Sequence, residues 1–263
     1  MPKFAANLSM LFTEHPFLER FERASAAGFE AVEFLFPYEY DIAAVARELR
    51  RNGLELVLFN LPAGDFAAGD RGLANDPRRV EEFRSGVQKG VRIATELGAG
   101  RLNCLAGLRL AGVAEEAQAA TLIDNLRYAA DAAAAASVLQ VVEPLNAFDA
   151  PGYFLPTPES GFNVVEGAAH PNLRMQYDVY HAQRMSGNLT ATIAERIGAI
   201  GHVQIADSPA RHEPGTGEIN YPFVFRALDD AGYDGWVSLE YRPLRDTASS
   251  LTWLREMGYW PSV

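Results

Sequence analysis

Four polar residues stand at the ends of short apolar runs in the second half of the chain. Glu143 closes the run Leu-Gln-Val-Val-Glu, Asp178 closes Met-Gln-Tyr-Asp, Gln204 follows His-Val, and Glu240 follows Val-Ser-Leu. Three carboxylates brought together without a cation repel one another and lose hydration, so some must be protonated or a metal must neutralise them. Oxygen ligands without cysteine or histidine favour a hard ion, Mg²⁺ or Mn²⁺, over Zn²⁺. A single strand-end acid can simply cap the next helix, but four such residues on neighbouring strands favour one divalent cation.

Two side chains near these residues have the chemistry to bind a substrate. His181 lies three residues after Asp178, in an expected loop, where an imidazole can hydrogen-bond a substrate oxygen or act as a weak acid. Arg211 lies in a long loop rich in turn residues, and its guanidinium suits bidentate recognition of a carboxylate. Either residue could instead be an ordinary surface side chain of a loop. We hypothesise that both contact substrate and that Arg211 recognises an acid group.

Other acidic residues lie close to these motifs in the sequence. Glu33 is inside an apolar run, so its carboxylate must be paired or lie near the site, because an unpaired buried carboxylate is costly. Its role stays open. Asp207, Glu213 and Glu218 are expected to shape their loop or cap the helix that begins at Tyr221, rather than contact substrate.

Eight short apolar runs alternate with longer segments of helical period along the whole chain. Apolar residues step by three and four from Val80 to Leu97, and glycines such as Gly53 and Gly98 suit left-handed helix caps. Eight strand-helix units in about 250 residues predict a closed (β/α)8 TIM barrel, and we expect residues 1–263 to form one catalytic domain. The carboxyl ends of barrel strands meet at one face, so the four polar residues, from strands five to eight, would converge there. The expected strands are Phe4–Met10, Ala31–Phe36, Glu55–Asn60, Arg101–Leu105, Leu139–Pro144, Arg174–Val179, His202–Ala206 and Trp236–Tyr241.

Composition excludes several classes of protein. The chain carries 23 Lys and Arg against 34 Asp and Glu, a net charge of −11 that argues against a nucleic-acid partner. The single cysteine, Cys104, lies in an apolar run and is expected to be a buried small residue, which fits a reducing cytoplasm. No run is long enough to span a membrane, and the apolar stretch Phe4–Phe12, interrupted by Asn7, does not fit a signal peptide. The first βα turn has no Gly-x-Gly-x-x-Gly, which weakens a dinucleotide-binding interpretation. The sequence leaves homo-oligomerisation open.

The motifs quoted above resemble those of hydroxypyruvate isomerase and its close relatives, within the xylose-isomerase-like barrel superfamily. The resemblance extends over essentially the whole chain, and the long motif from His202 to Tyr221 is its most specific part. It implies a metal held by Glu143, Asp178, Gln204 and Glu240. Related ketose epimerases usually have histidine at the position of Gln204, so this residue places the chain with the hydroxypyruvate isomerase branch.

The resemblance also implies a reaction, an aldose-ketose type proton shift. The metal would chelate adjacent oxygens of a hydroxy-keto acid and stabilise an enediolate, while Glu143 and Glu240 remove and return a proton at neighbouring carbons. For hydroxypyruvate the product would be tartronate semialdehyde, and a four-carbon acid such as 2-oxotetronate is nearly as good a candidate.

Three other classes compete with this interpretation. A ketose 3-epimerase would use the same metal and paired glutamates, and only the pocket would distinguish it. A barrel-type abasic-site endonuclease requires a histidine-rich multi-zinc site and a DNA-binding surface, against which stand only five histidines and the net charge of −11. A non-catalytic metabolite-binding barrel gives no reason for two glutamates beside a metal.

Overall fold

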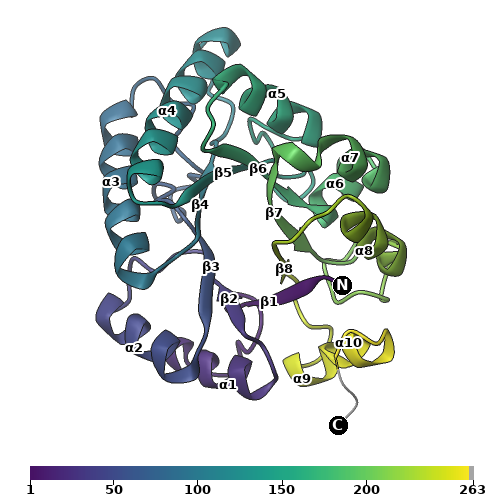
Figure 1. The fold of residues 1–263 in the computed structure, drawn as a ribbon. Coiled ribbons are helices and arrows are strands. Elements are labelled where there is room, and N and C mark those ends of the chain that lie inside the picture. The colour runs from purple at the N-terminus through teal and green to yellow at the C-terminus, as the bar shows by residue number, and fades with distance from the viewer. Residues whose placement is uncertain (261–263) are drawn as a thin grey trace.

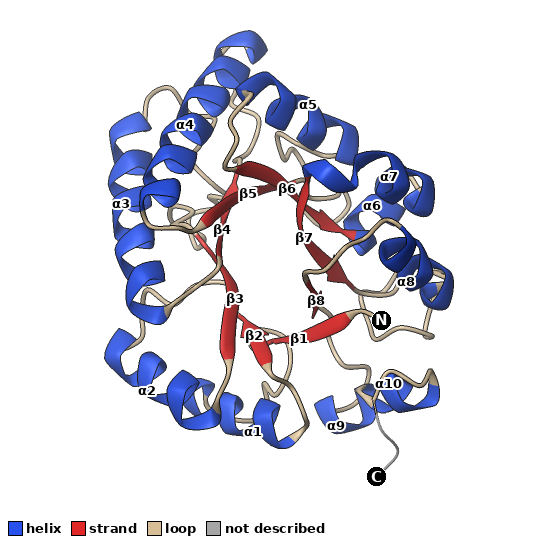
Figure 2. Ribbon diagram, viewed as in Figure 1, coloured by secondary structure: helices blue, strands red, loops and turns tan. Residues whose placement is uncertain are grey.

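The computed structural model describes residues 1–260, in which eight parallel strands close into a barrel in chain order (Figures 1 and 2). All eight expected strands are present, although β1, β2 and β8 end two or three residues earlier than expected, at Asn7, Glu33 and Leu239. The predicted TIM barrel is confirmed. The strands are β1 (Lys3–Asn7), β2 (Ala31–Glu33), β3 (Glu55–Asn60), β4 (Arg101–Leu105), β5 (Leu139–Glu143), β6 (Leu173–Asp178), β7 (Ile200–Ile205) and β8 (Trp236–Leu239).

Helices surround the barrel and bury their apolar faces against it (Figure 2). In α3 the buried residues include Phe83, Val87 and Leu97, which follow the predicted helical period. Gly53 and Gly98 end α2 and α3 at φ values of +64° and +68°, the left-handed conformation expected of them. The α-helices are α1 (Arg20–Ala26), α2 (Ile42–Asn52), α3 (Val80–Leu97), α4 (Glu115–Ala135), α5 (Pro158–Ala168), α6 (Val179–Met185), α7 (Leu189–Arg196), α8 (Tyr221–Asp230), α9 (Thr247–Ser250) and α10 (Thr252–Glu256). Two short 3-10 helices, Phe17–Glu19 and Ile197–Ala199, precede α1 and β7.

The strand ends bring buried polar side chains together in the otherwise apolar centre of the barrel. Neighbouring strands align Asn60 of β3 with Asn103 of β4, and Asp178 of β6 with Gln204 of β7. Cys104 is buried, as expected for a small core residue. None of the helices within residues 1–260 combines the length and apolar character that a membrane span requires.

Candidate active site

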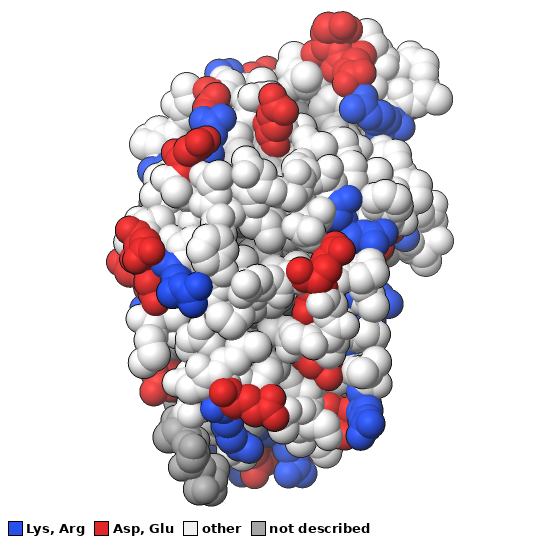
Figure 3. All heavy atoms as spheres, turned by 90° about the vertical axis from the view of Figure 1, so that its right-hand side faces the viewer, with Lys and Arg blue, Asp and Glu red and all other residues white. Residues whose placement is uncertain are grey.

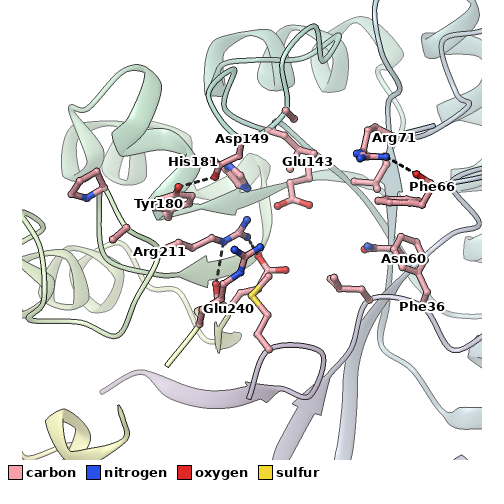
Figure 4. A pocket seen from close by; sticks show the side chains of 18 residues that line it. Phe36, Asn60, Phe66, Arg71, Glu143, Asp149, Tyr180, His181, Arg211 and Glu240 are labelled. Atoms are coloured by element: carbon pink, nitrogen blue, oxygen red, sulfur yellow. Dashed lines mark hydrogen bonds and ion pairs between the residues drawn. The ribbon is translucent and has the colours of Figure 1, made fainter. Parts of the chain in front are cut away.

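A cavity of about 540 Å³ opens at the carboxyl ends of the strands (Figure 4). Its two walls differ in chemistry. One wall carries Glu143, Tyr180, His181, Arg211 and Glu240, from β5 and from the segments that follow β6, β7 and β8. The other wall is mainly apolar and comes from the last residues of β3 and β4 and from the segments that follow β1, β2 and β3. Its members include Met10, Leu35, Phe36, Phe66 and Leu105, with Asn60 and Arg71 among them.

Three of the four predicted strand-end residues are buried carboxylates at this cavity or directly beside it. Glu143 is the last residue of β5, Asp178 is the last of β6, and Glu240 follows β8. Asp178 also caps α6, since its Oδ1 accepts a hydrogen bond from the Tyr180 amide at 2.8 Å. Asp178 therefore both caps α6 and belongs to the acidic cluster, which consists of Glu143, Asp178 and Glu240. Its second oxygen, Oδ2, is directed toward this cluster.

The environment makes ionisation of these three carboxylates costly. Burial, together with the charges of Glu240 and Asp178, raises the pKa of Glu143 well above its usual value. Burial raises the pKa of Asp178 to about 6 and that of Glu240 to about 8, with Arg211 acting in the opposite direction on both. Strongly perturbed acids in a cavity are typical of a functional site, because burial without full compensation is rarely retained for stability alone.

His181 is in a helix, contrary to the expected loop position. It lies in the first turn of α6, which begins directly after β6 because Asp178 caps it, and the side chain is only 4% exposed. Its Nδ1 accepts a hydrogen bond from the backbone N–H of Asn146 at 3.1 Å. Since Nδ1 is an acceptor, the proton of the neutral imidazole is on Nε2. Burial lowers the pKa of His181 well below its usual value, so the ring is neutral. Nε2 has no hydrogen-bond partner within residues 1–260 and is 3.5 Å from Oδ2 of Asp178.

Arg211 lies inside the acidic cluster. Its Nη2 donates to Oε2 of Glu240 and is 3.5 Å from Oδ2 of Asp178, and its guanidinium lies 5.1 Å from the centroid of the Tyr180 ring. Tyr180 is held in turn by its hydroxyl, which donates to Asp149 at 2.7 Å. The positive charge of Arg211 is thus shared between two carboxylates of the protein itself.

Gln204 belongs to a second buried polar group, directly below the carboxylates. Its Nε2 donates to Oε1 of Glu33 at 2.7 Å, and its Oε1 accepts a hydrogen bond from Gln176 at 2.6 Å. Glu33 also accepts hydrogen bonds from Asn7 at 2.8 Å and from His202 at 2.7 Å. The carboxylate of Glu33 is therefore paired, one of the two arrangements expected of it from the sequence.

Asp207, Glu213 and Glu218 hold their loop through hydrogen bonds, one of the two roles expected of them. Asp207 shapes its loop by accepting hydrogen bonds from backbone amides that include those of Gly215 and Gly217, both at 2.9 Å. Glu213 accepts from the Leu244 amide and Glu218 from the hydroxyl of Ser208. None of the three caps α8, because Asn220 does so through its own side chain.

Sequence reasoning missed several polar residues that contact the cluster. Asn103 of β4 donates to Glu143 at 2.9 Å and to Asn60 of β3 at 3.1 Å, and Asn7 of β1 is 3.4 Å from Glu240. The rule that selected the carboxylates, a polar residue at the carboxyl end of an apolar strand, would also have selected Asn7 and Asn60, but not Asn103, which lies in the middle of β4. Arg71 and Asp149 carry no such signal, because they lie in loops.

The donor set fits a divalent cation. One ligand atom from each of Glu143, Asp178 and His181 lies within 4.8 Å of the other two. Three buried carboxylates share a single compensating guanidinium, which leaves the cluster with excess negative charge when all three are ionised. His181 is the weakest member of this set, because a metal-ligating histidine normally donates from its other ring nitrogen, whereas Nδ1 here accepts.

Comparison with known proteins gives the family. The protein-family model described as xylose isomerase-like TIM barrel matches residues 21–257. The chain belongs to this family.

Members of the xylose isomerase-like TIM barrel family resemble this chain over nearly its full length. Hydroxypyruvate isomerase of Escherichia coli K12 is 49% identical, covering 97% of this chain and 98% of its own. The 2-oxo-tetronate isomerase of Cupriavidus necator H16 is 46% identical over 97% of this chain and 98% of its own. The chain is accordingly an isomerase of the family.

A solved structure agrees with the fold of this family member in detail. The crystal structure described as AP endonuclease, family 2 from Brucella melitensis superimposes with a TM-score of 0.95. It is 47% identical and the match covers 97% of this chain and 99% of that one.

Proposed function

We propose that the protein is a Mg²⁺- or Mn²⁺-dependent isomerase that interconverts hydroxypyruvate and tartronate semialdehyde by enediolate proton transfer. The observation that carries the proposal is the presence of two buried carboxylates, Glu143 and Glu240, on one cavity with raised pKa values. Isomerases named for hydroxypyruvate and 2-oxo-tetronate among the relatives support it. In this proposal residues 1–263 work as a single catalytic domain, because all eight strands build one barrel.

The metal would be held by Glu143, Asp178, Gln204 and Glu240, with His181 beside it rather than on it. When bound there, the ion would supply positive charge that polarises the carbonyl group of a hydroxy-ketone. Gln204 would contribute its amide oxygen, which accepts a hydrogen bond from Gln176 in the structure, and its amide nitrogen donates to Glu33.

Proton transfer requires two groups that reach neighbouring carbons. One glutamate removes a proton from the hydroxymethyl carbon, and the other adds a proton to the former carbonyl carbon, which converts the ketone into an aldehyde. The hydroxyl proton meanwhile passes from one oxygen to its neighbour. His181 donates from Nε2 to a substrate oxygen, and Arg211, held between Glu240 and Asp178, binds the substrate beside them.

The isotope record of the product tests this mechanism. In D₂O, early tartronate semialdehyde should carry solvent deuterium at the carbon that gains hydrogen, as measured by NMR before reversal scrambles the label. Glu143→Gln and Glu240→Gln should each lower turnover by about 10²- to 10⁴-fold with metal bound. Glu159→Gln, on the exposed start of α5, is the matched control. Near-normal rates in both active-site variants would refute the two-glutamate mechanism.

A four-carbon 2-oxo acid is the second candidate substrate. The cavity, at about 540 Å³, has room for the longer chain, and relatives named 2-oxo-tetronate isomerase are 46% and 45% identical. A substrate screen of metal-loaded protein against both acids and free ketoses separates these candidates and also tests the ketose 3-epimerase alternative. Metal-loaded protein that turns over none of them would favour the non-catalytic binding barrel.

DNA cleavage is disfavoured by the same site. Of the five histidines, only His181 lies in the acidic cluster, which leaves no histidine-rich set for several zinc ions. On the face drawn in Figure 3, acidic and basic side chains are interspersed rather than gathered into a basic surface, and the net charge is −11.

A further inference from the structure

Three guanidinium groups line the cavity, and they differ in what compensates their charge. Arg211 is paired with Glu240 and Asp178. Arg242 is exposed to solvent. Arg71, in the segment between β3 and α3, is half-buried and makes no ion pair with any residue of the described part of the chain.

The surroundings of Arg71 orient its side chain without neutralising it. Nη1 donates to the carbonyl oxygens of Asp70 at 2.7 Å and Phe66 at 3.2 Å, and the guanidinium lies 4.7 Å from the centroid of the Phe66 ring. The adjacent carboxylate of Asp70 is held by Arg79 instead, at 2.8 and 2.9 Å. A half-buried, oriented cation that lines a cavity and makes no ion pair within residues 1–260 is suited to bind an anion.

The backbone that carries Arg71 is held against the barrel. Gly72 has a φ of +116°, and a Cβ at this position would lie 2.2 Å from the carbonyl oxygen of Leu105, the last residue of β4. The Gly72 amide also donates to Ala63 at 3.0 Å. Only glycine permits this approach, so the position of Arg71 is built into the chain rather than left to a mobile loop.

Arg71 lies across the cavity from the acidic cluster. Figure 4 shows it beside Phe66 on the opposite side from Arg211, with Glu143 between the two. A substrate carboxylate next to Glu143 and Glu240 would meet like charges, whereas the same group directed to Arg71 meets an uncompensated cation. A hydroxy-2-oxo acid would therefore place its reacting carbons at the glutamates and its acid group at Arg71.

We propose that Arg71 binds the substrate carboxylate and selects short 2-oxo acids over neutral hydroxy-ketones. This inference deepens the proposed function and rests on it. The two arginines then have different roles. Arg71 binds the carboxylate of the substrate, and Arg211 binds the substrate beside the reacting carbons.

Arg71→Ala, Arg71→Lys and the charge-matched control Arg47→Ala, on the exposed side of α2, test the assignment. Calorimetry on metal-loaded protein measures the binding of two probes. D-glycerate carries the carboxylate but has no keto group to isomerise. Dihydroxyacetone has a hydroxymethyl group in place of the carboxylate of hydroxypyruvate. Arg71→Ala should weaken D-glycerate binding and lower kcat/KM for hydroxypyruvate by roughly 10- to 100-fold, mostly through KM, because a charge-assisted contact is lost. Dihydroxyacetone binding should be unchanged, and Arg71→Lys should fall between Arg71→Ala and the wild type because lysine lacks the planar fork.

The outcomes are distinguishable. Unchanged D-glycerate binding in Arg71→Ala, or no D-glycerate binding by the wild type, overturns the assignment. Equal losses for D-glycerate and dihydroxyacetone make Arg71 a structural residue and overturn it as well. If wild-type protein isomerises no short 2-oxo acid, the proposed function fails, while the two binding measurements still decide what Arg71 recognises.

Discussion

Glu33 holds together the polar group beneath the acidic cluster, and removing its carboxylate has calculable consequences. The side chain is fully buried, and its two oxygens accept three hydrogen bonds, from Asn7 at 2.8 Å, Gln204 at 2.7 Å and His202 at 2.7 Å. Burial raises the pKa of Glu33, but the contacts with His202 and Gln204 outweigh it and leave the pKa below its usual value. The carboxylate is therefore ionised and acts only as an acceptor.

Replacing Glu33 with leucine removes the acceptor and keeps most of the volume. Three buried donors would lose their partner at about 1 to 3 kcal/mol each before relaxation. With partial relaxation of the site, the loss of these three contacts gives about 3 to 5 kcal/mol as the destabilisation that we expect for Glu33→Leu. Glu33→Gln should cost about 1 to 2 kcal/mol, because its oxygen still accepts from Asn7 and Gln204 and only the contact with His202 must rearrange.

The same variants test whether Glu33 positions Gln204 for the metal. Residues that orient a metal ligand typically change metal affinity by about 10- to 100-fold, so Glu33→Leu should weaken Mn²⁺ binding on that scale. Urea unfolding of metal-free protein measures the stability change, and Mn²⁺ titration followed by EPR measures the affinity. Glu30→Gln, on the exposed residue before β2, is the control. Unaltered unfolding of Glu33→Leu would refute the energetic argument, and reduced stability with unaltered Mn²⁺ affinity would refute the positioning role.

Three further outcomes follow from the site. In metal-free protein, burial raises the pKa of Asp178 to about 6 and of Glu240 to about 8. Both carboxyl groups therefore bind protons more tightly in the folded than in the unfolded protein. The free energy of unfolding should consequently fall as the pH rises from about 4.5 toward 8. Mn²⁺ should accordingly raise the thermal midpoint more at pH 8 than at pH 6, and an equal rise at both would contradict the assigned ligands. Arg211→Ala should impair acidic and neutral substrates alike in steady-state assays, because its charge is already shared with two carboxylates; a loss confined to acids would return acid recognition to Arg211. Gly72→Ala should lower stability and weaken D-glycerate binding, because its Cβ would displace the backbone from Leu105; calorimetric affinity equal to that of the wild type would show that Arg71 does not depend on this contact.

The barrel and the strand-end carboxylates could be predicted from the sequence for a simple physical reason. Parallel strands in a closed barrel follow chain order, so a polar residue that ends an apolar run must face the same mouth as its neighbours. Glu143, Asp178 and Glu240 needed no further information to be brought together. Asn7 and Asn60 end β1 and β3 and obey the same rule, whereas Asn103 lies in the middle of β4 and carries no such signal.

Only the tertiary structure decided what the loop residues do. The partner of Arg211, the tautomer of His181 and the unpaired charge of Arg71 depend on contacts between segments far apart in the sequence: Arg211 with Glu240, His181 with Asn146, and Gly72 with Leu105. Side-chain periodicity specifies which face of a strand or helix is buried, but it carries no information about the path of a loop. A loop is placed by individual hydrogen bonds and close approaches, and the charge that it presents to a substrate exists only once those contacts have formed.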